Sequence, residues 1–150
     1  PLMPNTLLVG VTQSGETADT LSAIAMDKQR RTEATSAFRP RLLGITNRMQ
    51  SSLARLVDYT IDIHAGIEIG VAATKTFIAQ LVAFYCLALD LAYRRQTLSL
   101  TQLEQIIGQL WQLPAQIESI LENLERQIEE LAHEFAETQD FIFIGRGINY

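Results

Sequence analysis

The chain has 150 residues, of which 47% are hydrophobic and 19% are charged. This length suits about one domain, and this composition excludes an intrinsically disordered chain. Its 12 basic and 17 acidic residues give a net charge of −5, which argues against a nucleic-acid-binding protein. The single cysteine, Cys86, excludes an internal disulfide and a cysteine-based zinc site, and we expect it to be buried.

The first part of the chain alternates between strand and helix patterns. Apolar runs without a polar face are typical of strands buried on both sides, and strict alternation is typical of a half-buried strand. These patterns predict strands at residues 6–11, 41–46 and 59–64. Apolar residues at helical spacing predict helices at residues 17–30, 51–57 and 74–93. The order predicts an α/β fold with a doubly wound, mostly parallel sheet, and residues 29–40 are expected to form a long, basic surface loop.

A pair of helices is expected to follow the sheet. Apolar residues recur at helical spacing over residues 103–110 and again over residues 117–135. Pro114 stands between them and suits the first turn of a new helix. Acidic residues crowd residues 101–140, which predicts a solvated helical surface rather than an acidic docking tail. A further strand is expected to begin near Phe141.

The most apolar window, residues 76–93, is long enough to raise the question of a membrane span. It contains Gln80 and Asp90 and follows Lys75, so a buried core helix is favoured over a span. Residues 1–4 do not have the pattern of a secretory signal, since no basic residue precedes an apolar run. We therefore expect a cytoplasmic location.

The strongest candidate site is the turn between the first predicted strand and the first predicted helix. Ligands of open α/β sheets bind at the carboxyl edge of the strands, where this turn lies. The first N–H groups of a helix lack intrahelical partners and carry partial positive charge. Four side chains of the turn carry hydroxyl or amide groups, namely Thr12, Gln13, Ser14 and Thr17. This is more than helix capping needs, so we favour a phosphate cradle that needs no lysine and no metal, although Glu16 and Asp19 weakly oppose an anion there.

A second candidate is the loop of residues 65–76, which also joins a strand to a helix. Its glycines allow a tight backbone path beside a ligand. Lys75 followed by Thr76 is suggestive of a Walker loop, but that loop requires glycine immediately before the lysine, and Thr74 stands there. We therefore reject a Walker loop. The sequence Gly145-Arg146-Gly147 is an incomplete dinucleotide fingerprint and carries little by itself.

Candidates for acid–base chemistry are few. The chain has 2 histidines, and we expect His133 on a helix surface and favour a structural role for His64. Glu68, within the second loop, is expected beside the pocket, where it would pair with Lys75 or orient a loop. These groups supply no convincing nucleophile and base, so we assign no catalytic residue.

Three segments of the chain point to a family. They are Gln13–Thr20, Glu68–Lys75 and Phe143–Gly147. In order and spacing they resemble the isomerase part of the glutamine–fructose-6-phosphate aminotransferase family, which consists of two sugar-isomerase (SIS) domains. The first segment alone resembles any SIS domain, and the second narrows the resemblance to this enzyme type.

The resemblance implies an enzyme that combines fructose 6-phosphate with ammonia from glutamine to give glucosamine 6-phosphate. By the family pattern, Val71 contacts the sugar through its backbone, and the sugar phosphate is held by Thr12, Gln13, Ser14 and Thr17. We expect fructose 6-phosphate or glucosamine 6-phosphate as ligand, a homodimer, and no cofactor, nucleic-acid partner or membrane partner. The family usually has serine in place of Thr12, which keeps a hydroxyl. It often has serine where this chain has Ala73, so this chain lacks one possible donor near the sugar.

The resemblance also implies a domain organisation. Residues 1–97 would belong to the first SIS domain without its N-terminal part, residues 98–138 would connect, and residues 139–150 would hold the first strand of a second SIS domain. The family's acid–base glutamate, ring-opening histidine and C-terminal lysine would follow Tyr150, so we expect the chain alone to be inactive. Two alternatives stay open, a non-catalytic phosphosugar-binding regulatory module and another phosphosugar isomerase or deglycase. The acidic helices argue against a DNA-binding regulator.

Overall fold

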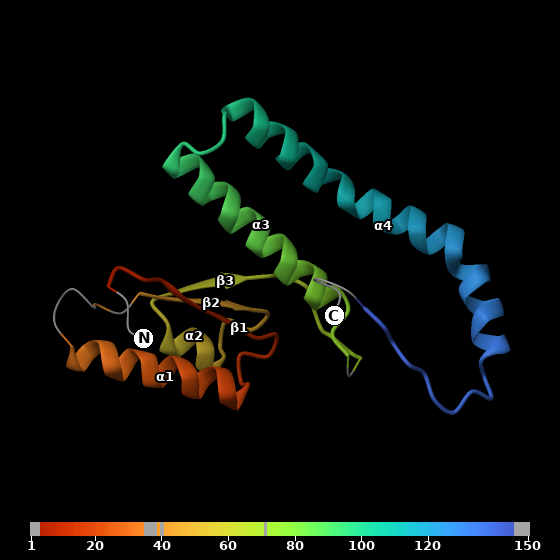
Figure 1. Cartoon of the computed structure of the whole chain (residues 1–150), viewed down its shortest axis with the longest axis horizontal. Coiled ribbons are helices and arrows are strands. Elements are labelled where there is room, and N and C mark those ends of the chain that lie inside the picture. The colour runs from red at the N-terminus through yellow and green to blue at the C-terminus, as the bar shows by residue number, and fades with distance from the viewer. Residues whose placement is uncertain (1–3, 35–38, 40, 71, 146–150) are drawn as a thin grey trace. The chain divides into compact units, whose positions relative to one another are not determined.

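The computed structural model describes residues 4–34, 39, 41–70 and 72–145. Three parallel strands form an open sheet in the order β1-β2-β3, with bounds Leu8–Val11, Leu42–Thr46 and Tyr59–Asp62 (Figure 1). Val9 pairs with Leu43, and Ile45 pairs with Ile61. Each strand lies within the range predicted for it, and the parallel α/β sheet is confirmed.

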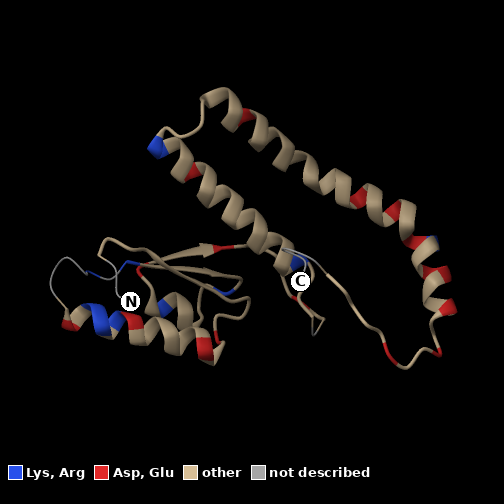
Figure 2. Cartoon of the chain, in the orientation of Figure 1, with Lys and Arg blue, Asp and Glu red and all other residues tan. Residues whose placement is uncertain are grey.

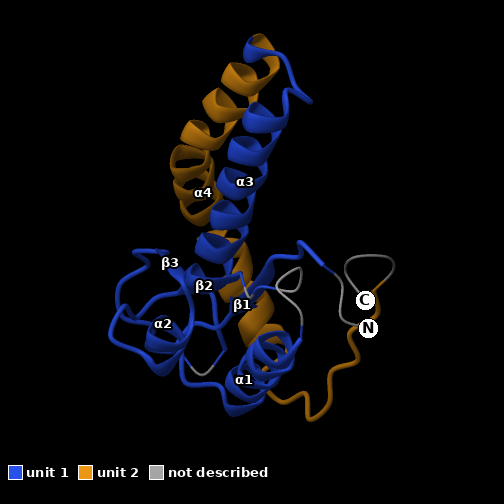
Figure 3. Cartoon of the chain, turned by 90° about the vertical axis from the view of Figure 1, so that its left-hand side faces the viewer, with its two compact units in different colours: residues 1–100 blue, residues 101–150 orange. Residues whose placement is uncertain are grey.

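Helices cover both faces of the sheet. Helices α1 (Ala18–Glu33) and α2 (Ser52–Leu56) lie against one face, and α3 (Lys75–Arg95) lies against the other (Figures 1 and 3). Every residue of the central strand β2 is buried, as expected for an apolar run inside a parallel sheet. The core beneath β2 consists of Ile24, Leu42 and Leu53, with Leu8, Leu21, Leu56 and Val57 packed around it.

Helix α1 is longer than predicted. It continues to Glu33, so the first residues of the predicted loop 29–40 are helical. Side-chain bonds one turn apart support this extension, from Arg31 Nε to Asp27 Oδ2 at 2.6 Å and from Gln29 Nε2 to Glu33 Oε1 at 2.9 Å. Most of the remainder of that predicted loop lies outside the described residues.

The prediction of a buried core helix over residues 76–93 is wrong for this chain. Only 6% of the apolar window of α3 is buried, because one stripe of the helix, with Thr76 and Ala83 on it, faces the sheet. Phe77, Phe84 and Cys86 are exposed. Among the described residues, α3 is the 1 helix long and apolar enough to cross a membrane, and length and composition alone are weak evidence for a span.

The chain divides into two compact units, residues 1–100 and residues 101–150 (Figure 3). The predicted pair of helices is a single helix, α4 (Leu100–Glu134), and Pro114 lies in its interior. Pro114 cannot donate one backbone bond, but leucine, glutamine and glutamate on both sides favour helix strongly enough to continue through it. The acidic side chains predicted to be solvated lie along the exposed α4 (Figure 2).

The strand predicted near Phe141 does not form in residues 141–145, which have no regular secondary structure. A strand requires a hydrogen-bonded neighbour, and within the described sheet β1, β2 and β3 pair only with one another. Phe141 instead contacts aromatic rings of its own unit, with ring centroids 6.0 Å from Phe135 and 6.4 Å from Phe143. Arg146 and Gly147 lie outside the described residues.

Candidate functional site

Three loops meet at the carboxyl edge of the sheet. The turn Thr12–Thr17 follows β1, residues 47–51 follow β2, and residues 63–70 follow β3. Because the strands are parallel, all three loops emerge at the same edge, which is where ligands of open α/β sheets bind.

The turn after β1 brings two of the predicted phosphate-binding hydroxyls together. Thr12 Oγ1 and Thr17 Oγ1 are hydrogen-bonded at 2.6 Å, and Thr12 is buried. Ser14 Oγ accepts a bond from the Glu16 N–H at 3.1 Å, which leaves its own O–H free to donate elsewhere. All three hydroxyls therefore make a bond within the turn that joins β1 to α1.

The start of α1 carries no side-chain cap. Thr17 is the N-cap residue, and its side chain makes no capping bond. Within the described part of the chain, the N–H groups of Ala18, Asp19 and Thr20 have no hydrogen-bond acceptor, and the first helical bond is from Leu21 N–H to the Thr17 carbonyl at 3.0 Å. The hydroxyls of the turn therefore do not cap this helix, and the partial positive charge of its N-terminus is unsatisfied.

Glu16 does not occupy this helix end. Its Oε1 accepts a bond from the Ser52 N–H at 2.8 Å, at the start of α2. Hydrogen bonds from Ser52, together with the charges of Arg55 and Arg48, hold the pKa of the Glu16 carboxyl below its ordinary value. A carboxylate engaged in this way competes less with a bound anion than the sequence suggested.

Hydrogen bonds join the turn after β1 to the end of β2, the loop after it and α2. The Gln13 carbonyl accepts from Asn47 N–H at 3.1 Å and from Thr46 Oγ1 at 3.2 Å. The Gly15 carbonyl accepts from Leu53 N–H at 3.0 Å. Gly15 has φ +70° and faces Ser51, so this position favours glycine for both backbone conformation and space.

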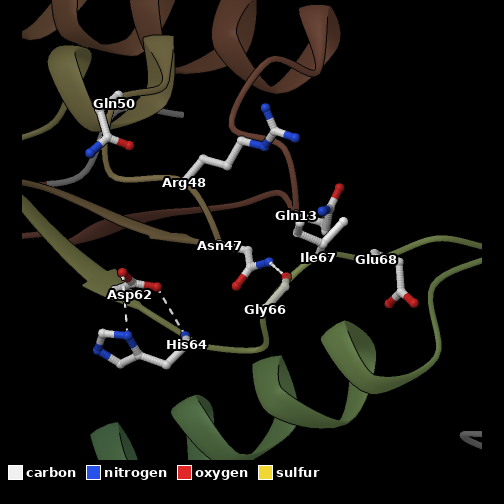
Figure 4. Close-up of a pocket in the computed structure, with 9 residues that line it drawn as sticks. All are labelled: Gln13, Asn47, Arg48, Gln50, Asp62, His64, Gly66, Ile67 and Glu68. Carbon is white, nitrogen blue, oxygen red and sulfur yellow. Dashed lines mark hydrogen bonds and ion pairs between the residues drawn. The ribbon is translucent and has the colours of Figure 1, made fainter.

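A cleft of about 530 Å³ lies at this edge, a volume within the range of small-molecule sites (Figure 4). It is lined by Gln13, Asn47, Arg48, Gln50, Asp62, His64, Gly66, Ile67 and Glu68. Of the four predicted phosphate-binding residues, Gln13 is the one that lines the cleft, and Thr12, Ser14 and Thr17 lie on the adjoining turn. Val71, the predicted sugar contact, lies outside the described residues.

Sequence reasoning missed the residues contributed by the loop after β2. Asn47, Arg48 and Gln50 line the cleft. Asn47 also fixes the third loop, because its Nδ2 donates to the Gly66 carbonyl at 2.5 Å and its Oδ1 accepts from Ala65 N–H at 2.9 Å. The carboxyl-edge rule that singled out the turn after β1 applies equally after β2, and it would have found these residues.

Glu68 orients the second candidate loop. Its carboxylate accepts bonds from the N–H and hydroxyl of Thr76 at 3.2 and 2.7 Å, and from those of Thr74 at 3.2 Å each. The Thr76 bonds, aided by those from Thr74, lower the pKa of Glu68 from 4.5 to about 2. Within the described residues, no ion pair joins Glu68 to Lys75.

His64 stands at the exposed rim of the cleft. Its side chain is 85% exposed, and its Nδ1 lies 3.5 Å from Asp62 Oδ2. Its backbone N–H donates to Asp62 Oδ1 at 2.9 Å, which supports a left-handed conformation with φ +50°. No cluster of three or more histidine, cysteine, aspartate or glutamate side chains suited to a metal ion occurs in the described part of the chain.

The fold and this edge match a known family. The family model of the SIS domain matches residues 1–90. The chain belongs to the SIS domain family. This SIS chain is 64% identical over 150 residues to a glutamine–fructose-6-phosphate aminotransferase (isomerizing) of Synechocystis sp., and 61% identical over 150 residues to that of Thermosynechococcus vestitus. Both matches cover 100% of the SIS chain and 24% of the relative, so the chain spans about a quarter of their length.

Solved structures agree with the fold. The C-terminal domain of glucosamine-fructose-6-phosphate aminotransferase from Francisella tularensis matches the SIS chain with a TM-score of 0.83 and 33% identity, over 97% of the SIS chain and 39% of that structure. A putative phosphosugar isomerase from Clostridium difficile matches with a TM-score of 0.74 and 21% identity, which supports the fold alone. The SIS fold expected from the sequence is therefore confirmed.

Proposed function

We propose that this chain is the phosphosugar-binding part of a glutamine–fructose-6-phosphate aminotransferase, which converts fructose 6-phosphate and glutamine-derived ammonia to glucosamine 6-phosphate. The names of the aminotransferase relatives support the enzyme type. The observation that carries the proposal is the uncapped N-terminus of α1, which follows a turn with the hydroxyls of Thr12, Ser14 and Thr17 and adjoins a cleft lined by Gln13.

The phosphate would be held by uncharged donors. Thr12, Ser14 and Thr17 would supply hydroxyls, the first turn of α1 would supply backbone N–H groups, and Gln13 would supply its amide at the cleft. The side chains and the helix dipole together favour an anion without a metal ion. The sugar ring would then extend from the phosphate along the cleft, where we propose that the backbone of Val71 contacts it.

The cleft residues bind and orient rather than transfer protons. A general base works best when its pKa lies near the operating pH. Four hydrogen bonds lower the pKa of Glu68 to about 2, far below that range. His64 lies at the rim with an almost fully exposed side chain. We therefore propose that residues 1–150 hold the substrate without converting it.

The wider organisation follows from the same proposal. Residues 1–97 would be most of a first SIS domain, residues 98–138 would connect it, and residues 139–150 would open a second one. In the longer protein, residues 141–144 would gain the neighbouring strand that they lack here. The enzyme would act as a cytoplasmic homodimer.

Titration calorimetry with fructose 6-phosphate, glucosamine 6-phosphate and inorganic phosphate tests the binding role. Ser14→Ala should weaken all three, since a hydrogen bond to a charged group contributes about 1.5–3 kcal/mol, or about ten- to a hundred-fold in affinity. Ser22→Ala removes the same hydroxyl from the exposed surface of α1 and serves as the matched control. Equal affinities of the two variants would refute the assignment of the phosphate to this turn.

A further inference from the structure

The turn after β1 has no positively charged side chain to neutralise a bound phosphate. Its donors are neutral, yet the phosphate group of a sugar phosphate carries between one and two negative charges near neutral pH. Glu16 adds a negative charge to the same turn. A cation near the cleft would balance these charges, and the described residues that line the cleft include one permanent cation, Arg48.

The backbone of Arg48 is tied to the turn by hydrogen bonds through the neighbouring residues Thr46 and Asn47. Its N–H donates to Thr46 Oγ1 at 3.3 Å, and Thr46 Oγ1 donates in turn to the Gln13 carbonyl at 3.2 Å. The preceding residue, Asn47, donates its N–H to the same carbonyl at 3.1 Å. Two short chains of hydrogen bonds therefore fix the backbone of Arg48 relative to the turn.

The Arg48 side chain is available for a ligand. It is exposed, and its guanidinium makes no hydrogen bond or ion pair within the described part of the chain. In Figure 4 it extends from the loop after β2 toward the segment that leads from β1 into α1. Its charge also contributes to the lowered pKa of Glu16, which places that charge within electrostatic range of the turn.

The carboxylates of the cleft and of the turn have bonds of their own, and within the described residues none forms an ion pair with Arg48. Asp62 accepts the His64 N–H at 2.9 Å and faces the His64 ring. Glu68 accepts four bonds from Thr74 and Thr76. Glu16 is bonded to Ser52. In the described part of the chain, the side chains of Gln13, Gln50 and Arg48 line the cleft without a side-chain bond, and each carries N–H donors.

We propose that Arg48 contacts the phosphate of the sugar ligand and is a specificity-determining residue for anionic over neutral sugars. This inference rests on the proposed function. A guanidinium offers a planar pair of N–H donors that matches two phosphate oxygens, and it keeps its charge at every accessible pH. It would supply the positive charge that the hydroxyl turn lacks.

The test compares Arg48→Gln with Arg30→Gln. Arg30 is an exposed arginine near the end of α1, at the opposite end of that helix from the turn, so its replacement removes the same charge without touching the cleft. Fructose 6-phosphate, inorganic phosphate and neutral fructose are titrated against the 150-residue chain at low and at physiological salt. Unfolding by urea is recorded for each variant, and we expect both to be as stable as the unmodified chain.

Arg48→Gln should weaken fructose 6-phosphate and inorganic phosphate by about 5- to 30-fold, between the effect of an exposed ion pair and that of a desolvated one. The salt dependence of binding should decrease, and Arg48→Lys should recover part of the affinity. Arg30→Gln should stay within about twofold of the unmodified chain.

Three results would overturn the inference. If Arg48→Gln binds like Arg30→Gln while the unmodified chain binds fructose 6-phosphate, the role of Arg48 is wrong and the proposed function stands. If Arg48→Gln weakens the binding of fructose 6-phosphate but not that of inorganic phosphate, Arg48 does not contact the phosphate. If the unmodified chain binds neither phosphate compound, the proposed function fails and this inference fails with it.

Discussion

Replacing Gly15 by alanine should destabilise the chain more than replacing Gly66, the other glycine with positive φ among the described residues. Gly15 has φ +70°, a left-handed conformation that costs a non-glycine residue about 1–2 kcal/mol. A Cβ at this position would also overlap the Oγ and Cβ of Ser51 and lie 3.1 Å from Thr46 Oγ1. Ser51 is buried, and its Oγ caps α2 by accepting from Ala54 N–H at 3.3 Å, so it has little room to move.

The two costs combine to about 2–5 kcal/mol, because overpacking of a tight site costs a further ~1–3 kcal/mol. Gly66 distinguishes the conformational cost from the steric cost. It has nearly the same φ, +68°, but no atom lies within 4 Å of an added Cβ. Gly66→Ala should therefore cost only about 1–2 kcal/mol. Urea unfolding followed by circular dichroism measures both free-energy changes. Each substitution should shift the unfolding midpoint without changing the slope.

A double variant isolates the steric part. Gly15→Ala combined with Ser51→Gly removes the atoms that the new methyl group would meet, and glycine at an N-cap costs only a few tenths of a kcal/mol. The double variant should therefore be about as stable as Gly66→Ala. The reasoning is refuted if Gly15→Ala alone matches Gly66→Ala within about 0.5 kcal/mol, or if Ser51→Gly gives no recovery.

Two further predictions concern Glu68 and catalysis. Because hydrogen bonds lower the pKa of Glu68 from 4.5 to about 2, its contribution to stability is complete above pH 4.5 and is lost as the pH falls toward 2. Over that range the unfolding free energy of Glu68→Gln should fall less steeply than that of the unmodified chain, and parallel curves would contradict this. Incubation with fructose 6-phosphate and ammonium should yield no glucosamine 6-phosphate, measured against a full-length aminotransferase, and turnover near the control's rate would place a catalytic base within residues 1–150.

The sequence was sufficient for the sheet because its strands are buried runs bounded by polar turns. Residues 42–46 have no polar face, and such a segment is stable only between two neighbouring strands in a covered sheet. The helix α1 was equally clear, since Leu21 and Ile24 supply its buried stripe. Strand ends were predicted too long by one to two residues, because pairing stops where the neighbouring strand stops.

The long apolar helices were less predictable. Apolar spacing in α3 indicated burial, but burial depends on what lies beside a helix and not only on its own composition. Here β2 accepts one stripe of α3, so Thr76 and Ala83 are covered while Phe77 and Phe84 are exposed. Pro114 misled for a related reason, because its local preference for a first turn was weaker than the helix propensity of both flanks.

The sequence pointed to the part of the candidate site that has a distinctive side-chain composition. It missed the part whose place at the cleft depends on the order of the strands. Hydroxyl crowding singled out the turn Thr12–Thr17. Nothing in the composition of residues 47–50 distinguishes them. Their place at the cleft comes from the parallel order that puts the end of β2 between the ends of β1 and β3. A cleft lined from three loops becomes visible only when that order is known.

This central position gives Asn47 a role that joins the whole edge. Its N–H binds the Gln13 carbonyl at 3.1 Å, and its side chain binds Ala65 N–H and the Gly66 carbonyl at 2.9 and 2.5 Å. One residue after β2 therefore joins the turn after β1 to the loop after β3. These bonds are made by backbone groups and by the Asn47 amide, so they leave the side chains of Gln13, Ser14 and Arg48 available for a ligand. Because the frame and the recognition groups are separate, substitutions of Ser14 or Arg48 should change affinity while the loops keep their positions.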